Sequence, residues 1–517
     1  MNEASRDGGT IGRDDFVKDV IARVLFFVAL VVNIYCLVRW IKQPLLDQFY
    51  FRQTQTALST YWLEHTPGLA HWLNYETPIL GSPWQIPMEF PLFQWIVALA
   101  HMATGIPLDP LGRCISGILF YCCLWPLSML VRDLGFNRRL FYVSAALLLF
   151  SPIYIYWSRA FLIESTALFF SLLYLAWLNR YLVHRKRSHI ILATIAGVLG
   201  ILVKVTTFAA FGVAGGALVV ADIYVTGRWK SVAQLLKYYL PTLLCMVVCF
   251  ICLEWWLKRS DAIKSVDVIG SMLTSKSLDT WNFGTLSQRM SLQLWKDTVW
   301  KRTIPESIGS TFVLLIWIAA LIQARSGRIR VLILLPAALF ILPFLLFTNL
   351  YIVHSYYAYG NGVFLVLALS IALWSLAERA PAWLFACLCV LMALAELNTF
   401  YTNYHLAISV RHRKDDPILT GEFIRNNTGP LATILVVGND WSPEVAYYSQ
   451  RRAIYLPGWV SGSILESIKK EPEKLTYNGL PIAAVVEHDQ VKESDSRKWA
   501  DQLAAGLPAH SFGAYHV

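Results

Sequence analysis

The sequence predicts an all-α polytopic membrane protein with a small α/β domain at its C-terminal end. The 517-residue chain is 56% hydrophobic and only 15% charged, whereas soluble domains are about 25% charged. Its mean hydropathy is +0.49, and apolar runs of about 20 residues recur along most of its length. Only helices and closed barrels satisfy every backbone polar group in lipid, so these runs predict transmembrane helices.

The apolar runs predict about eleven spans, in a range of roughly 10–13. The predicted spans are residues 20–41, 114–132, 140–157, 164–182, 190–204, 207–225, 236–257, 308–323, 331–350, 360–378 and 382–401. Residues 90–104 are also apolar, but they are short for a span and Pro87, Pro91 and Pro107 bracket them. We expect a juxtamembrane or re-entrant helix there.

The basic loops predict the orientation. They are Arg138 with Arg139, residues 184–187, Arg228 with Lys230, and Arg325, Arg328 and Arg330. All of them fall on one side if the spans alternate and residues 90–104 do not cross. By the positive-inside rule that side is cytoplasmic, together with residues 1–19. The transmembrane domain is then residues 20–401, with a first outer loop at 42–112 and a second at 258–306.

The tail, residues 402–517, differs from the rest of the chain. Strand-like runs at 432–437, 453–457 and 482–487 alternate with helix-like runs at 442–450 and 461–470. This alternation predicts an extracytoplasmic α/β domain with a partly parallel sheet. The nine cysteines lie in apolar runs and none lies in the predicted outer regions, so no disulfide framework is expected. The net charge of +10 belongs to cytoplasmic loops, which argues against a nucleic-acid partner.

A polar stretch follows the first span directly. Asp47 comes first, and Gln48, Arg52 and Gln55 recur at a spacing that places them on one helix face. Gln53 lies between them. Asp47 alone is also typical of a helix N-cap. Amides and a guanidinium beside a carboxylate suit sugar hydroxyls and phosphate oxygens, so the stretch is a candidate site.

Further polar residues abut other spans on the predicted outer face, where ionisable groups are costly and indicate function. Each also has a structural interpretation. Glu164, five residues after Arg159, could interact with a helix dipole. Lys204 could extend to the interface, and Tyr356 and Tyr357 could belong to an aromatic belt. The remaining candidates are His354, Glu89 and Gln94.

Taken together, in the order in which they occur along the chain, these residues resemble the motifs of the GT-C superfamily of membrane glycosyltransferases. The resemblance covers about residues 20–380. The chain is most similar to protein O-mannosyltransferases and bacterial lipid A aminoarabinose transferases, and also resembles bacterial members linked to surface polysaccharides. The matching features are Asp47 after the first span, the segment Glu89–Trp95, Arg113 before the next span, Ser158-Arg159 followed by Glu164, Lys204, and His354 with Tyr356 and Tyr357.

Two features depart from that pattern. The mannosyltransferases have an Asp-Glu pair where this chain has the single Asp47. The aminoarabinose transferases have Lys-Pro-Pro where this chain has Glu89-Phe90-Pro91. Because of these departures, the resemblance does not identify which sugar is transferred or which acceptor receives it.

The resemblance implies transfer of a sugar from a polyprenyl-phosphate donor to a glycan, lipid or protein acceptor, outside a bacterial cytoplasmic membrane. Such transfer needs a base, for which we expect Asp47 with a raised pKa. It also needs cations on the leaving phosphate: Arg52, Arg113, Arg159, Lys204 and His354. Glu164 would orient the acceptor or balance those cations. A single displacement predicts inversion, and the lipid tail would lie among the late spans.

No cofactor is required for this reaction. A divalent cation, Mg or Mn, would suit oxygen ligands from Asp47 and Glu164. Two other classes of function remain open. A transporter or flippase of lipid-linked sugars would also place polar groups near the membrane surface, although inverted repeats and broken helices are not evident. A non-catalytic relative would bind glycan through the tail.

Overall fold

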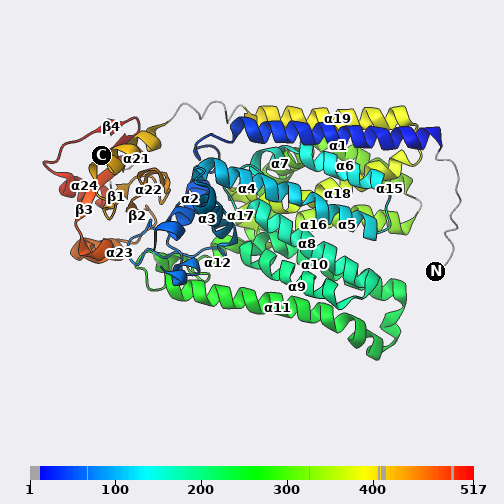
Figure 1. Cartoon of the computed structure of the whole chain (residues 1–517), viewed down its shortest axis with the longest axis horizontal. Coiled ribbons are helices and arrows are strands. Elements are labelled where there is room, and N and C mark those ends of the chain that lie inside the picture. Colours follow the sequence, from blue (N-terminus) through cyan, green and yellow to red (C-terminus); the bar gives the residue numbers. More distant parts are fainter. Residues whose placement is uncertain (1–11, 67, 325, 406–407, 409–414, 491–493) are drawn as a thin grey trace.

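The structure is a computed structural model that describes residues 12–66, 68–324, 326–405, 408, 415–490 and 494–517. A long helical bundle carries the small α/β domain at one end (Figure 1). We call that end of the bundle the domain end and the opposite one the far end. Residues 1–11 of the predicted cytoplasmic segment, and 406–407 and 409–414 near the predicted domain boundary, lie outside the described residues.

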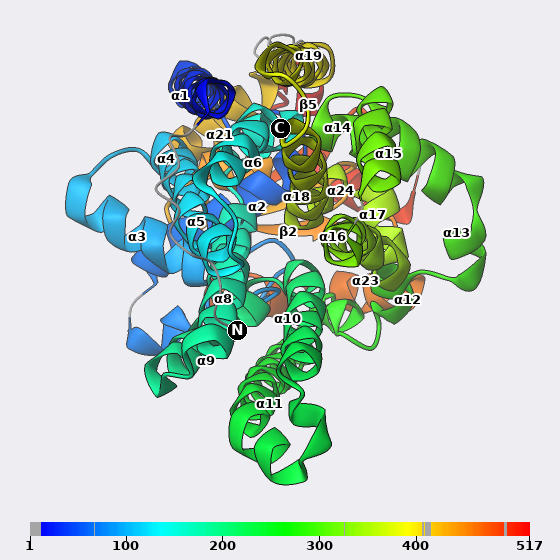
Figure 2. The same cartoon turned by 90° about the vertical axis from the view of Figure 1, so that its right-hand side faces the viewer.

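The bundle is built from two runs of helices, which Figure 2 shows end-on. The first run is α1 (Arg13–Trp40), α4 (Leu108–Cys122), α5 (Leu124–Asp133), α6 (Arg138–Phe150), α7 (Pro152–Trp157), α8 (Glu164–His184), α9 (Arg187–Val203), α10 (Val205–Thr226) and α11 (Val232–Lys264). The second run is α14 (Ile304–Ile308), α15 (Leu314–Gln323), α16 (Gly327–Leu346), α17 (Thr348–Val353), α18 (Ala358–Ala377) and α19 (Ala382–Phe400).

Eight helices of the described chain are long and apolar enough to cross a membrane. A ninth candidate is a pair, 293–308 and 311–323, bent by 77°; its first half includes the π-helix η4 (Gln293–Thr303). The other two predicted spans contain α6, of 13 residues, and α9, of 17 residues. The predicted polytopic helical class is therefore confirmed, with two of the expected spans built from shorter helices.

Several helices end close to the domain. Pro152 lacks an N–H group and cannot continue α6, so residues 140–157 form α6 and α7 instead of one helix. Lys204 has extended backbone angles (φ −160°, ψ 96°) and separates α9 from α10. The helices of the predicted outer loops are α2 (Tyr50–His65), α3 (Leu92–Thr104), α12 (Asp279–Phe283) and α13 (Leu286–Met290). In Figure 1, α2 and α3 lie between the bundle and the domain.

The domain contains a five-stranded sheet in the order β2-β1-β3-β5-β4. Its strands are β1 (Thr433–Val437), β2 (Arg452–Leu456), β3 (Ile482–His488), β4 (Ser511–Phe512) and β5 (Tyr515–His516), and its helices are α21 (Asp416–Asn427), α22 (Glu444–Ser449), α23 (Gly462–Lys470) and α24 (Asp495–Ala504). β1 is parallel to β2 and β3, whereas β5 is antiparallel to β3 and β4. The predicted partly parallel sheet is confirmed.

The first outer loop joins the domain to the bundle. Pro78 and Ile79 accept backbone hydrogen bonds from Ala453 (3.0 Å) and Tyr455 (2.9 Å), and Leu80 pairs with Ile454. The loop thus covers the open edge of β2, where unpaired backbone groups would otherwise face outward. One apolar core continues from α2 through this loop into β1 and β2. The domain is therefore packed onto the bundle and can take part in a site between them.

Candidate functional site

Asp47 is held between two buried arginines at the domain end. Its Oδ2 lies 2.8 Å from Nη2 of Arg159 and 3.3 Å from Nη2 of Arg113, and Gln53 donates a hydrogen bond to Oδ1. The Arg159 guanidinium lies over the ring of Tyr156, 4.7 Å from its centroid. In the described part of the chain, Nε and Nη1 of Arg159 have no hydrogen-bond partner. Arg159 therefore keeps two buried donors for another anion.

The environment of Asp47 corrects two predictions. Burial alone would raise the pKa of Asp47, but Arg113, Arg159 and the Gln53 amide hold that pKa below the ordinary value for aspartate. The expected raised pKa is therefore wrong, and the carboxylate is ionised at neutral pH. In addition, α2 begins at Tyr50 with Phe49 before it in the left-handed region (φ 51°), so the N-cap position belongs to Phe49 and not to Asp47.

The start of α2 also changes the predicted polar stripe. Gln48 lies before the helix, and its side chain donates to the Asn403 carbonyl (3.4 Å). Arg52 and Gln55 do lie together, joined by a hydrogen bond from Nη1 of Arg52 to Oε1 of Gln55. The stripe therefore lacks Gln48, which the helical spacing had included.

Arg52 forms an ion pair with Glu89 through its other terminal nitrogen. Their side chains are 15% and 24% exposed, more than those of the other paired charges at this site. Tyr75 fixes the Glu89 segment by donating to the Glu89 carbonyl (2.8 Å) and accepting from the Met88 amide (3.0 Å). This pair is consequently the most exposed ion pair of the site.

A second buried ion pair joins Glu164, at the start of α8, to Lys204, between α9 and α10. Nζ of Lys204 lies 2.7 Å from Oε1 of Glu164 and 3.9 Å from the centroid of the Tyr357 ring; Tyr356 is 4.9 Å away. Arg52 and Glu89 act electrostatically on Glu164. The Glu164–Lys204 pair therefore lies near the Arg52–Glu89 pair.

His354 lies against these tyrosines but is not a cation. Its ring centroid is 5.4 Å from that of Tyr356 and 5.7 Å from that of Tyr357. Burial, together with the nearby Arg52, Lys204 and Arg302, lowers the pKa of His354 to about 3. The imidazole is therefore neutral at neutral pH, and its expected role as a phosphate-binding cation is wrong. A neutral ring can still donate one hydrogen bond.

The predicted residues differ in how closely the structure brings them together. Most belong to the cluster of two networks described above, which we call the domain-end cluster: Asp47, Gln53, Arg113 and Arg159, and then Arg52, Gln55, Glu89, Glu164, Lys204, His354, Tyr356 and Tyr357. Arg113 is fully buried and also donates to the Pro44 carbonyl (3.0 Å), so it lies behind Asp47. Gln94 is buried on α3, and its Oε1 has no partner among the described residues.

Comparison with known proteins agrees with this architecture. No protein-family model and no curated protein sequence matches the chain. The crystal structure of ArnT from Cupriavidus metallidurans bound to undecaprenyl phosphate matches with a TM-score of 0.62 and 14% identity, covering 95% of this chain and 96% of that one. Its apo structure gives a TM-score of 0.56 at 14% identity, covering 95% of both chains. The chain has the GT-C fold.

A third structure with this fold is similar over only part of its length. The mycobacterial arabinofuranosyltransferase AftD matches with a TM-score of 0.51 and 14% identity, and the match covers 95% of this chain but 37% of AftD. At such identities the similarity concerns the fold. The resemblance to GT-C proteins inferred from the motifs is therefore confirmed for the architecture of the bundle and domain.

The chain offers no evident metal-binding cluster in the regions the structure describes. No group of three or more His, Cys, Asp and Glu side chains there is placed to hold an ion. Asp47 and Glu164 are each bound by their own cations, Arg113 with Arg159 and Lys204 respectively. A divalent ion between the two carboxylates, Mg or Mn, would have to displace these partners.

Two features near the site were not predicted from the sequence. Arg302, on η4, donates to the Ile352 carbonyl (3.1 Å) and acts electrostatically on His354. Its position just before a predicted span is the same signal that identified Arg159, so it could have been found. Trp281 packs against His354 with ring centroids 6.2 Å apart, and nothing in its sequence context predicts that contact.

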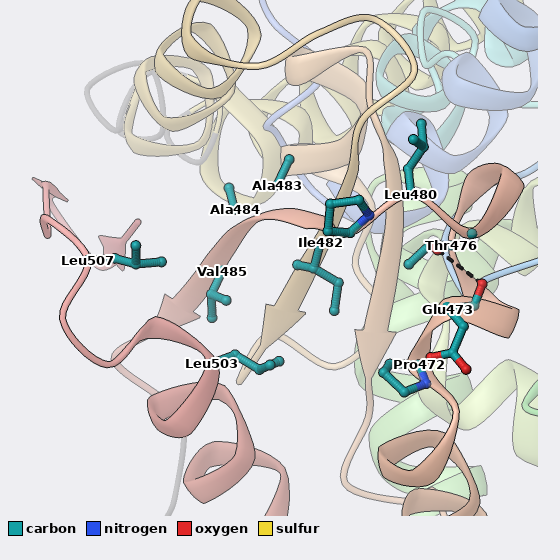
Figure 3. Close-up of a pocket in the computed structure, with 12 residues that line it drawn as sticks. Pro472, Glu473, Thr476, Leu480, Ile482, Ala483, Ala484, Val485, Leu503 and Leu507 are labelled. Atoms are coloured by element: carbon teal, nitrogen blue, oxygen red, sulfur yellow. Dashed lines mark hydrogen bonds between the residues drawn. The ribbon is translucent and has the colours of Figure 1, made fainter.

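A cavity of about 410 Å³ lies elsewhere in the domain, between β3 and α24 (Figure 3). Its lining is mostly apolar and includes Ile482, Val485, Leu503 and Leu507. None of its lining residues belongs to the domain-end cluster, so it does not form part of this site.

Proposed function

We propose that this protein is an inverting glycosyltransferase that moves a sugar from a polyprenyl-phosphate donor to an acceptor at the extracytoplasmic face of the membrane. The observation that carries the proposal is the gathering of cations in the domain-end cluster. Arg52, Arg113, Arg159 and Lys204 lie with three carboxylates, Asp47, Glu89 and Glu164, and Nε and Nη1 of Arg159 have no hydrogen-bond partner among the described residues.

A buried cation whose donors lack partners is costly unless an anion joins it. A phosphate diester brings one negative charge, and the phosphate monoester that leaves brings up to about two. The solved ArnT structure that shares this fold contains undecaprenyl phosphate, which supports a polyprenyl-phosphate ligand for this chain. The fold and the cations of the cluster thus favour the same class of donor.

Three cations of the cluster bind the phosphate in different ways. Arg52 is partly exposed and has a planar, fork-shaped head that can hold two phosphate oxygens. Lys204 places a point charge beside Tyr357. Arg159, beside Asp47, adds two donors that have no partner among the described residues. Together these groups stabilise the negative charge that grows on the phosphate as the sugar departs.

In the transfer step the acceptor oxygen bonds to the anomeric carbon while the bond from that carbon to the phosphate oxygen breaks. The phosphate leaves with the bonding electrons, and the acceptor proton passes to Asp47. Asp47 acts as an ionised carboxylate of low pKa, which suffices when the proton moves late, because the transition state already has oxocarbenium character. Glu164 balances Lys204 and keeps it in place.

The test uses the purified full-length protein in nanodiscs with radiolabelled polyprenyl-phosphate sugars and with lipid, lipid-linked glycan and protein acceptors. We expect the wild type to release the sugar from the phosphate and transfer it to an acceptor, and we expect loss of both release and undecaprenyl phosphate binding in Lys204→Gln and Arg52→Gln. Lys258→Gln, a change to a lysine whose side chain is 77% exposed, is the matched control. Movement of intact donor between leaflets would establish the transporter instead, and donor binding without sugar release would establish the non-catalytic relative.

The base is tested separately by comparing Asp47→Asn with Glu89→Gln. Removing a general base typically lowers the rate by about 100-fold or more, and we expect this loss for Asp47→Asn. A small effect of Asp47→Asn beside a large one of Glu89→Gln would transfer the role to Glu89. The anomeric configuration of the product, measured by NMR, checks inversion.

A further inference from the structure

Two tryptophans of the domain lie at the carboxyl ends of its parallel strands. Trp441 is in the loop after β1, and Trp459 is in the loop after β2. In sheets of this kind, ligands bind outside the carboxyl ends of the strands, where neighbouring loops converge. The parallel part of the sheet therefore directs both indole rings towards the edge at which a ligand is expected.

This edge of the domain faces the domain-end cluster. The ring of Trp441 packs against Phe51 of α2, with centroids 5.2 Å apart. Phe51 is the residue before Arg52, whose side chain is the most exposed of the cluster's paired cations. A ligand lying on Trp441 would consequently reach the cluster along α2.

The two tryptophans form an ordered aromatic surface together with a carboxylate. Their ring centroids are 5.9 Å apart and the rings are nearly perpendicular, at 86°. Nε1 of Trp459 donates to Oδ1 of Asp440 (2.9 Å), and Trp459 is 36% exposed. Asp440 is exposed and has left-handed backbone angles (φ 47°), a strained conformation that tends to occur at functional sites.

Buried polar contacts hold the loop beneath this surface. The Glu444 carboxylate accepts hydrogen bonds from Asn439, Ser442 and the hydroxyl of Tyr515 (2.8 Å). Asn439 and Ser442 flank the Asp440–Trp441 pair on the two sides. The rings are thus fixed before any ligand arrives, which lowers the entropic cost of binding.

The chemistry of this surface fits a carbohydrate. Aromatic faces are electron-rich, and the C–H groups of a pyranose ring are complementary to them. The second oxygen of Asp440 can accept a hydrogen bond from a sugar hydroxyl. A carboxylate beside the rings disfavours a phosphate, so this surface suits the acceptor better than the donor. We propose that Trp441, Trp459 and Asp440 form a subsite for the acceptor glycan, an inference that rests on the proposed function.

The test measures saccharide binding directly, without sugar transfer. The purified full-length protein in nanodiscs is titrated with cellobiose, maltose and diacetylchitobiose by saturation-transfer NMR. We expect binding of at least one disaccharide, and about tenfold weaker binding in Trp441→Ala and Trp459→Ala, the loss typical of one aromatic contact. Trp459→Phe should restore much of the affinity.

Trp229→Ala is the matched control, because Trp229 is also exposed (56%) but lies outside the domain, between α10 and α11. Melting temperatures show whether the variants are folded. Binding of no disaccharide by the wild type, or equal binding by Trp441→Ala, Trp459→Ala and wild type, would overturn the inference. Lys204→Gln should retain saccharide binding, so failure of the donor site and failure of this subsite give different results.

Discussion

At the scale of single residues, burial decides which groups of the cluster carry charge. His354 has a pKa of about 3 because it is buried beside Arg52 and Lys204, whereas an imidazole in an unfolded chain has a pKa of about 6.5. The unfolded state therefore binds a proton that the folded state does not, and folding stability decreases as the pH falls from about 6.5 towards 3. We expect His354→Gln to flatten the dependence of melting temperature on pH in this window. The exposed His184 supplies the control His184→Gln, and equal slopes in both variants would contradict the prediction.

A second prediction at this scale concerns the two arginines that share Asp47. Asp47→Asn removes the carboxylate that lies 2.8 Å and 3.3 Å from two buried guanidinium groups. Breaking a buried pair from one side costs about 3–5 kcal/mol, because the remaining charge stays buried without a partner. We expect a marked decrease in melting temperature for Asp47→Asn, partly recovered in the double variant with Arg159→Gln. Additive losses in a double-mutant cycle would show that the two residues are not coupled.

At the scale of elements, the first outer loop determines where the domain sits. Arg452 of β2 pairs with Glu76 of the loop (2.9 Å), and its guanidinium lies between the rings of Trp62 and Tyr477, 4.0 Å and 4.2 Å from their centroids. We expect Glu76→Gln to weaken the loop's attachment to β2, so that the amides of Ala453 and Tyr455 exchange hydrogen faster. Glu471→Gln, in an exposed pair with Lys474, should leave exchange unchanged. If both amides stay protected from exchange in Glu76→Gln, the backbone hydrogen bonds hold the loop on β2 without the ion pair.

The same elements show what the sequence could and could not predict. Apolar runs locate the long helices, and alternating runs locate β1, β2 and β3, because burial imposes those periods. Charges beside spans identify candidates such as Lys204 and Glu164, because they are costly at that depth. Their partners could not be predicted: Asp47 binds Arg113 and Arg159 from distant helices, and only the packing fixes those pairs. β4 and β5 have two residues each, too few to show a period.

At the scale of the whole molecule, the proposed reaction requires the domain end to face outward. The far end carries Arg139, which bonds to Asp15, Asp19 and Glu378 and so joins the starts of α1 and α6 to the end of α18. Basic loops of this kind remain in the cytoplasm.

The orientation can be tested by labelling introduced cysteines. The nine native cysteines lie outside the domain, so a cysteine introduced into the domain is labelled specifically once exposed native thiols are replaced. We expect a membrane-impermeant maleimide to label Ser463→Cys in intact cells, because Ser463 is exposed on α23. Ser326→Cys, at the start of α16, should react only after the membrane is opened, since α16 begins at the far end. Labelling of Ser326→Cys alone in intact cells would place the cluster on the cytoplasmic side and would contradict the proposed extracytoplasmic reaction.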